Sequence, residues 1–151
     1  MTSYQITIPA ENQPGSLARV TSVLASEKIN IRAITITSFG ERGFFHLVVD
    51  DPKRAHAVLR EAGVSNELKQ VLAVLIDDKP GSLDSLVQRL AAERINCNNA
   101  YGFVLESYKH AVFVIDVDKM EEAQKLLSKS GYKTLTEDEL NSVEPFHYMK
   151  Y

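Results

Sequence analysis

The chain has 151 residues, of which 44% are hydrophobic and 25% are charged, and its formal net charge is −3. This composition predicts a globular protein with a packed core, and the acidic balance argues against nucleic acid or an anionic membrane as its main partner. The single cysteine forms no intramolecular disulfide, the N-terminus shows no secretory signal, and no apolar run approaches the roughly 20 residues of a membrane span, so we expect a cytoplasmic protein.

The chain begins with a strand signal and then a helix signal. Tyr4–Ile8 alternates hydrophobic and polar residues, which predicts a strand that ends at Pro9. Pro14 then opens a helix, because its missing N–H is not needed at the first helical position. Asn30 lies where this helix is expected to stop.

Two further strands and a second helix follow. Ile31–Phe39 and Phe44–Asp50 are rich in β-branched and aromatic residues, with a turn at residues 40–42. A short helix is expected over Pro52–Ala62 and a last strand from Val64 onward. This β-α-β-β-α-β order is the ferredoxin-like split motif, an antiparallel sheet with its helices on one face.

The same signals recur 66 residues later in the chain. ENQPGSL at Glu11–Leu17 is followed by DDKPGSL at Asp77–Leu83. Further pairs under this shift are Leu24 with Leu90, Asn30 with Asn96 and Asp50 with Asp116. A repeat of this length indicates two duplicated small domains rather than a solenoid.

The duplication sets the predicted domain organisation. Beyond Asp116 the shift becomes 68, so that Gly63 meets Gly131, and we attribute this to a two-residue insertion. The sequence therefore predicts an α+β protein of two tandem ferredoxin-like βαββαβ units, residues 1–68 and 69–136, followed by a tail at residues 137–151. Residues 63–70 are the expected connection, and a short helix over Glu137–Val143 is expected in the tail.

The first strand of the second unit, Val71–Ile76, is hydrophobic on both faces, whereas Tyr4–Ile8 alternates. A strand of this kind requires cover on both sides. Helices can cover one side, and the tail, the sister unit or a second chain can cover the other. We therefore predict a homo-oligomer, most simply a homodimer, with a central strand covered within one chain as the alternative.

Other functional classes find little support. RGFFHLVV at Arg42–Val49 begins like the RNA-stacking motif of RNA-recognition domains, but the later stacking positions carry His46 and Val49. The histidines are scattered, no Cys/His group has metal-ligand spacing, and no phosphate loop or nucleophile motif is present. We therefore expect neither an enzyme nor a metal site nor a bound cofactor, and read the acidic pairs as turn residues.

The strand–helix junction is the remaining candidate site. The first N–H groups of a helix lack intrahelical partners and lie at the positive end of the helix dipole, so a carboxylate is a natural ligand there, and Gly15 allows it a close approach. The alternative is that Pro-Gly-Ser simply starts a helix, with Ser16 helping to satisfy its N–H groups. Asn30 and Asn96 are either left-handed helix caps or ligand amides.

The order of these motifs resembles the ACT domain family. In that family a strand is followed by x-N-x-P-G-x-L, an amphipathic helix and I-N-I, which here reads ENQPGSLARVTSVLASEKINI and then DDKPGSLDSLVQRLAAERINC. The resemblance covers residues 3–136. It implies a regulatory module that binds a small ligand, commonly an amino acid, between ACT units joined edge to edge.

The resemblance also implies the residues that bind the ligand. In ligand-binding members, the strand–helix loop contributes an Asn and the Gly, and the facing unit contributes the Asn after its helix. With their loop and strand neighbours, the candidate ligand-binding residues are Asn12, Gln13, Pro14, Gly15, Asn30, Ile31, Asp78, Lys79, Gly81 and Asn96. An ionised Asp78 only accepts hydrogen bonds and repels a carboxylate, so the two sites should differ, with Asn12 and Gly15 the stronger pair.

The sequence thus predicts a non-catalytic regulatory protein that binds a free amino acid between ACT units. Ala10 and Ile76 stand where some members carry a polar ligand group, so the pocket should be less polar than theirs. The alternatives are a protein-interaction subunit that regulates an amino-acid biosynthetic enzyme, and a transcription-linked regulator that does not contact DNA itself. The expected partners are an amino acid and a second copy of the chain, with a metabolic enzyme as the partner under the subunit alternative.

Overall fold

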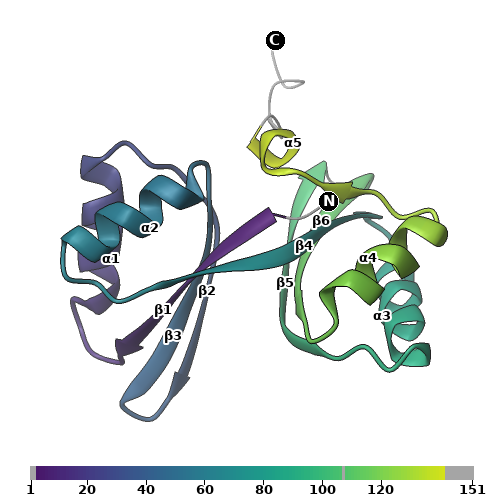
Figure 1. Ribbon diagram of the computed structural model, residues 1–151, viewed down its shortest axis with the longest axis horizontal. Helices are drawn as coiled ribbons and strands as arrows, with labels where there is room; N and C mark the ends of the chain where they lie inside the picture. The colour runs from purple at the N-terminus through teal and green to yellow at the C-terminus, as the bar shows by residue number, and fades with distance from the viewer. Residues whose placement is uncertain (1–2, 107, 142–151) are drawn as a thin grey trace. The chain divides into compact units, whose positions relative to one another are not determined.

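A computed structural model describes residues 3–106 and 108–141 (Figure 1). The chain divides into two compact units: the first spans Tyr4–Lys69, and the second contains Ser3 and the residues described from Gln70 onward. Both follow the βαββαβ order, which confirms the predicted fold of two tandem ferredoxin-like units. The elements are β1 (Ser3–Glu11), α1 (Ser16–Ser26), β2 (Ile31–Phe39), β3 (Arg42–Val49), α2 (Pro52–Glu61), β4 (Glu67–Asp77), α3 (Ser82–Ala92), β5 (Cys97–Glu106), β6 (His110–Val117), α4 (Met120–Lys129), β7 (Thr134–Leu135) and α5 (Glu137–Asn141).

In the first unit, β3 lies between β1 and β2 and pairs antiparallel with both. Helices α1 and α2 lie side by side on one face of these strands (Figure 1). The core between the two layers is hydrophobic and includes Ile6 and Ile8 from β1, Leu47 from β3, Leu24 from α1 and Leu59 from α2. The two-residue period of each strand places these β1 and β3 side chains on the helix side.

The second unit repeats this arrangement. Strand β6 pairs antiparallel with β4 and β5, and β7 pairs with the other edge of β4, so the order is β7-β4-β6-β5. Leu72 and Val74 pack with residues of α3 and α4 in the core. Val71 and Ala73 point to the opposite face and are also buried, as the two-faced composition of this strand predicted. Helices among the described residues are all too short or too polar to cross a membrane.

Three of the predicted element boundaries are wrong. The expected connection at residues 63–70 is partly strand, because β4 runs without interruption from Glu67 to Asp77 and no glycine or proline breaks it. Pro9 does not end β1, since pairing with β3 continues to Glu11 and a proline removes only one donor. Pro14 precedes the N-cap Gly15 and is not the first helical residue of α1.

The two-residue insertion also lies earlier than predicted. Ile6 pairs with Leu47 in the first unit, and Leu72 pairs with Ile115 in the second. The β1–β4 shift is therefore 66 and the β3–β6 shift is already 68, which places the extra residues in the β5–β6 hairpin. Asp118, and not Asp116, is the structural counterpart of Asp50.

The described part of the tail contains a single helical turn, α5, which ends at Asn141 and buries Leu140. Thr136 and Glu139 form a capping box at its start: the Glu139 N–H donates to Thr136 Oγ1 at 3.2 Å, and the Thr136 N–H donates to Glu139 Oε1 at 3.2 Å. The rest of the predicted helix, residues 142–143, lies outside the described residues.

Candidate functional site

The junction between β1 and α1 exposes the start of a helix. Gly15 is the N-cap, its φ of 95° lies in the left-handed region that favours glycine, and no side chain caps the helix. Gly81 holds the same place before α3 with a φ of 88°. The expected capping role of Ser16 is therefore wrong. Because the first N–H groups of a helix lack intrahelical partners, each junction offers donors and a partial positive charge.

Asn12 and Asp78 join each junction to the neighbouring hairpin. Asn12 Nδ2 donates to the carbonyl of Gly40 at 2.9 Å. Asp78 does the reverse in the second unit, where its Oδ2 accepts from the N–H of Tyr108 at 2.7 Å. An amide can donate and an ionised carboxylate can only accept. The difference between these two residues therefore matches the group that each hairpin presents.

The predicted loop residues of the first unit line two cavities. One, of about 140 Å³, lies between the junction and β2, and its lining includes Asn12 and Gln13. The rest of its lining is Ala10, Glu11, Ser16, Leu17, Ile36, Thr37, Ser38, Gly43 and Phe45. The other, of about 420 Å³, lies between α1 and the loop after α2, and Gln13, Pro14 and Gly15 contribute to it. Asn12 and Gln13 therefore line the same cavity, whereas Gly15 lines the other one, on a different side of the start of α1.

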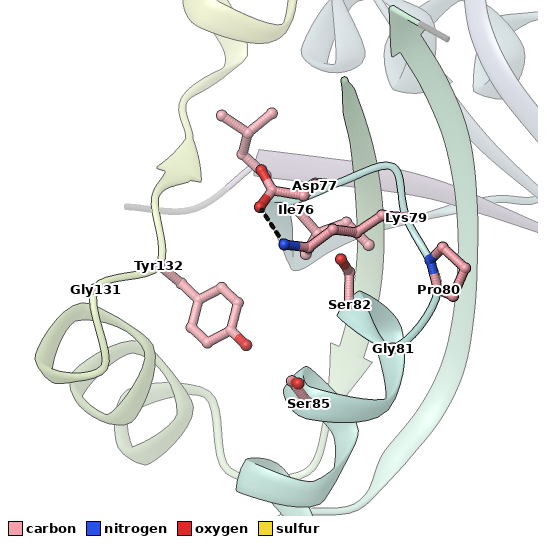
Figure 2. A pocket seen from close by; sticks show the side chains of 10 residues that line it. Ile76, Asp77, Lys79, Pro80, Gly81, Ser82, Ser85, Gly131 and Tyr132 are labelled. Atoms are coloured by element: carbon pink, nitrogen blue, oxygen red, sulfur yellow. Dashed lines mark ion pairs between the residues drawn. The ribbon is translucent and has the colours of Figure 1, made fainter. Parts of the chain in front are cut away.

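The second unit has a cavity of about 460 Å³ beside α3, shown in Figure 2. The hydroxyl groups of Ser82 and Ser85 and the ring of Tyr132 project into it from two sides. Lys79 also lines it, with Nζ 3.8 Å from Asp77 Oδ2. Three hydroxyl groups, an ammonium and a helix N-terminus form a surface suited to a carboxylate or another small polar anion.

Ser85 and Tyr132 were not predicted, and their counterparts in the first unit are chemically different. Under the shifts of 66 and 68 they match Arg19 and Val64. Arg19 donates through Nη2 to the carbonyl of Ala62, at the end of α2. The alignment of Gly63 with Gly131 in the sequence repeat could have located Tyr132, because Tyr132 directly follows Gly131.

The remaining predicted residues lie far from the junctions. Asn30 precedes β2, where its N–H donates to Asp50 Oδ1 at 3.0 Å, and Asn96 makes the same bond to Asp118 at 3.0 Å. Ile31 begins β2 beside Asn30. Since β2 has nine residues and a strand rises about 3.3 Å per residue, Asn30 and Asn12 are about 30 Å apart. A single unit does not bring them together.

Asn30 and Asn96 are also not the left-handed caps of their helices. The residues with positive φ just after these two helices are Lys28, at 58°, and Arg94, at 56°. Each lies two positions before the asparagine of its unit. The residue after it donates a hydrogen bond back to the helix, as in the bond from Ile29 N–H to Leu24 O at 2.9 Å. The cap interpretation of the two asparagines is therefore wrong.

Three further features of the sequence can be placed in the structure: the metal-ligand residue types, the cysteine and the RNA-like stretch. Residues 3–106 and 108–141 contain no cluster of His, Cys, Asp and Glu side chains placed to hold a metal ion. Burial raises the pKa of the Cys97 thiol, and the carboxylates of Asp118 and Asp116 raise it further, so the reactive thiolate is disfavoured at neutral pH. In the RNA-like stretch, Phe45 and Leu47 belong to the core.

The whole described chain matches one family model. The model of the ACT domain pair covers residues 1–144. This protein belongs to the ACT domain pair family. The resemblance inferred from the two Pro-Gly-Ser-Leu junctions is therefore confirmed.

Several solved structures have a similar fold. Protein BT0572 from Bacteroides thetaiotaomicron is 27% identical, with a TM-score of 0.87 over 94% of this chain and 97% of that one. The ligand-free regulatory subunit of aspartate kinase from Thermus thermophilus is 21% identical, with a TM-score of 0.60 over 83% and 91%. The aspartokinase α and β subunits are 20% identical, with a TM-score of 0.58 over 83% and 90%. No curated protein sequence matches the chain.

Proposed function

We propose that this ACT domain pair is a non-catalytic regulatory protein that binds a free amino acid at the β1–α1 junction. The observation that carries this proposal is the cavity of about 140 Å³ beside the exposed start of α1. Pockets for drug-sized ligands measure about 300–1,000 Å³. A cavity of this size, next to a helix N-terminus, suits a ligand as small as an amino acid.

The chemistry of the junction fits the two charged groups of an amino acid. The N–H groups at the start of α1 would receive the α-carboxylate. Asn12 uses Nδ2 to bond Gly40, so its Oδ1 would accept a hydrogen bond from the α-ammonium. Ala10, Leu17 and Ile36 line the same cavity, and they would contact the side chain of a mainly hydrophobic amino acid.

A panel of the twenty amino acids at millimolar concentration tests the proposal by thermal unfolding. At about a hundredfold over the dissociation constant, a ligand adds about 2.7 kcal/mol to the free energy of unfolding, which raises the melting temperature of a chain of this size by about 5–10 °C. We expect Asn12→Ala to abolish the shift and Tyr132→Phe, in the cavity of the second unit, to preserve it.

Two results would contradict this proposal. If no amino acid raises the melting temperature of the unaltered chain, the proposed function is wrong. If Tyr132→Phe abolishes the shift and Asn12→Ala keeps it, the ligand binds beside α3 and not beside α1. The melting temperature of each variant without ligand separates loss of binding from loss of folding.

A regulatory subunit of an amino-acid biosynthetic enzyme is a second candidate. It is favoured by the exposed hydrophobic side chains on β2 and β5, which provide a surface for another protein. Regulatory subunits of aspartate kinase share this fold. We expect the addition of the purified chain to change the rate of such a kinase from the same organism; an unchanged rate, with and without amino acids, would exclude this partner.

A further inference from the structure

The first unit contains a cavity of about 420 Å³ at the C-terminal end of α2, and this cavity shares no lining residue with the proposed amino-acid site. Its lining consists of two residues of α2 and the loop that leads to β4: His56, Arg60, Gly63, Val64, Ser65 and Asn66. Within residues 3–106 and 108–141, the Arg60 guanidinium and the Ser65 hydroxyl have no hydrogen-bond or ion-pair partner. Both groups are therefore available to a ligand.

Asn66 fixes the orientation of the His56 ring in this cavity. Its Nδ2 donates to the carbonyl of His56 at 3.3 Å and to the carbonyl of Val64 at 3.1 Å. A carbonyl only accepts hydrogen bonds, so these two bonds identify the amide nitrogen, and the amide oxygen is the atom 2.6 Å from His56 Nδ1. Nδ1 therefore carries a proton, and Nε2 is the ring nitrogen that is left for a ligand.

The side of α2 that carries the cavity is basic. Lys53, His56 and Arg60 follow one another at i, i+3 and i+7, so their side chains lie on one side of the helix. Lys53 Nζ lies 6.0 Å from the centroid of the Tyr4 ring, and Lys53 does not line the cavity. Arg60 therefore gives the cavity a fixed positive charge, with a second positive charge farther along the same side of α2.

The carboxylates that are nearest in the sequence point away from the cavity. Glu61 is seven residues after Arg54, so the two lie on one side of α2, and Arg54 is held at the end of α1 by its 2.8 Å bond to Glu27 Oε2. Glu67 is the first residue of β4 and points to the face opposite Leu68, which packs against the core. No carboxylate of the described residues lines the cavity, so none there repels an anion.

The negative end of the α2 dipole is also offset. A helix C-terminus disfavours an anion through the carbonyls that lack intrahelical partners. Here the carbonyl of Ala62 accepts from Arg19 Nη2, and the carbonyl of Leu59 accepts from the Val64 N–H at 2.8 Å. Arg19 also brings a positive charge to this end of the helix, so the cavity remains favourable for an anion.

We propose that this cavity is a second binding site of the chain and that it binds a phosphate group. The planar guanidinium of Arg60 would bind two phosphate oxygens, and the Ser65 hydroxyl would donate to a third. His56 Nε2 would accept a hydrogen bond from a protonated phosphate oxygen when the ring is neutral, and would donate one when the ring is charged. A carboxylate at neutral pH has neither a third oxygen nor a proton, so it would make fewer of these bonds.

The second unit lacks this combination of residues. Under the shift of 68, His56 corresponds to Gln124 and Arg60 corresponds to Ser128. Neither glutamine nor serine carries a charge at neutral pH, so the second unit has no fixed positive charge at these two positions. Each chain would therefore bind one phosphate group in this way, and the first unit would hold it.

Calorimetric titration of the full chain with inorganic phosphate tests the site. We expect one phosphate per chain, and we expect Arg60→Gln to weaken binding by about tenfold or more because it removes a charged donor. Lys53→Gln is the matched control: it removes the same charge from the same side of α2 but outside the cavity, and should weaken binding by less than about threefold. No binding to the unaltered chain, or an equal loss in the two variants, would overturn the proposal.

A second titration, with glycerol phosphate, identifies the source of the phosphate group. Tighter binding than that of inorganic phosphate assigns the site to a phosphate ester, and equal or weaker binding assigns it to free phosphate. Asn12→Ala should leave both titrations unchanged, so failure of the amino-acid proposal would not affect this one. Loss of phosphate binding in Asn12→Ala, at an unchanged melting temperature, would place the anion at the β1–α1 junction and overturn the proposal.

The nitrogen chemical shifts of the His56 ring test the geometry directly by NMR. We expect Nδ1 to carry the proton of the neutral ring in the unaltered chain, and the Nε2 signal to move when phosphate is added. Asn66 acts as a positioning residue, so Asn66→Ala should remove the preference for this tautomer and weaken phosphate binding while the protein stays folded. A neutral ring with its proton on Nε2, or an Nε2 signal that does not respond to phosphate, would overturn the proposal.

Discussion

At the scale of single residues, Asn12 and Asp78 illustrate how a repeat diverges without losing its structure. Both link a strand–helix junction to the adjacent hairpin. The first hairpin offers a carbonyl, that of Gly40, and the second offers an N–H, that of Tyr108. The side chain at the junction is a donor in the first unit and an acceptor in the second. Local hydrogen bonding alone therefore explains why one unit has Asn12 and the other has Asp78.

This explanation predicts unequal effects for two matched substitutions. Asn12→Asp replaces the donor by an acceptor that faces the carbonyl of Gly40, so we expect the free energy of unfolding to fall by about 1 kcal/mol. Asp78→Asn keeps an oxygen that accepts from Tyr108, so its effect should be smaller. Urea unfolding of both variants measures this, and an equal loss in the two would contradict the assigned hydrogen bonds.

Lys28 and Arg94 provide a second residue-scale prediction. Both adopt the left-handed conformation at the end of a helix, which costs a residue with a Cβ about 1–2 kcal/mol relative to its usual conformation. Glycine adopts the left-handed conformation without this cost, but part of the gain is lost because glycine has more conformational freedom in the unfolded chain. We expect Lys28→Gly to stabilise the protein by about 0.5–1 kcal/mol in urea unfolding. Lys28→Ala is the control, and a gain of the same size there would refute the conformational origin.

At the scale of elements, the sequence predicts types well and boundaries less well. Alternation in Tyr4–Ile8 and the helix signal at Pro14 located β1 and α1. The continuity of β4 was missed because Val64–Gln70 is polar and resembles a connection. The position of the insertion was missed because Asp50 and Asp116 match by letter, whereas the hydrogen bonds to Asn30 and Asn96 come from Asp50 and Asp118.

The candidate site was only partly predictable for a similar reason. Asn12, Gln13 and Gly15 were predicted from a local motif, which the sequence shows directly. Ser85 and Tyr132 meet only because the chain after α4 returns to the start of α3. A tertiary contact of this kind leaves no local spacing in the sequence, although the repeat provides an indirect guide through Gly131.

The α5 element is stabilised by a carboxylate and should respond to pH. The pKa of Glu139 is lowered, first by its hydrogen bond with Lys133 and then by the bond from the Thr136 N–H. The Lys133 Nζ lies 2.7 Å from Glu139 Oε2. A carboxyl group with a lowered folded pKa stabilises the structure above its unfolded pKa, and this contribution is lost as the pH falls through the folded value.

We therefore expect α5 to lose order as the pH falls through the lowered pKa of Glu139, which lies below the usual range for glutamate. The chemical shift of the Thr136 amide measures the transition by NMR. Glu139→Gln should remove it while retaining an acceptor for the capping box. If the amide of the Gln variant titrates like that of the unaltered chain, another group is responsible.

At the scale of the whole molecule, a ligand-binding site that is completed by two copies of the chain must couple ligand binding to dimerisation. In the homodimer predicted from the sequence, the site takes Asn12 from one ACT unit and the asparagine after the helix from a facing unit of the other copy, so the ligand binds the dimer better than the monomer. By linkage, ligand strengthens association, and association strengthens ligand binding by the same factor. A monomer that carried a complete site would show neither effect.

The apparent affinity for the amino acid should consequently rise with chain concentration until the dimer is saturated. Ile36→Lys places a charge among the exposed hydrophobic side chains of β2, so we expect this variant to remain monomeric and to bind weakly at every concentration. Calorimetric titrations at concentrations below and above the dimer midpoint, which sedimentation provides, measure both effects. Identical binding curves on the two sides of that midpoint would show that each copy holds a complete site, and that the asparagines after the helices act in structure and not in recognition.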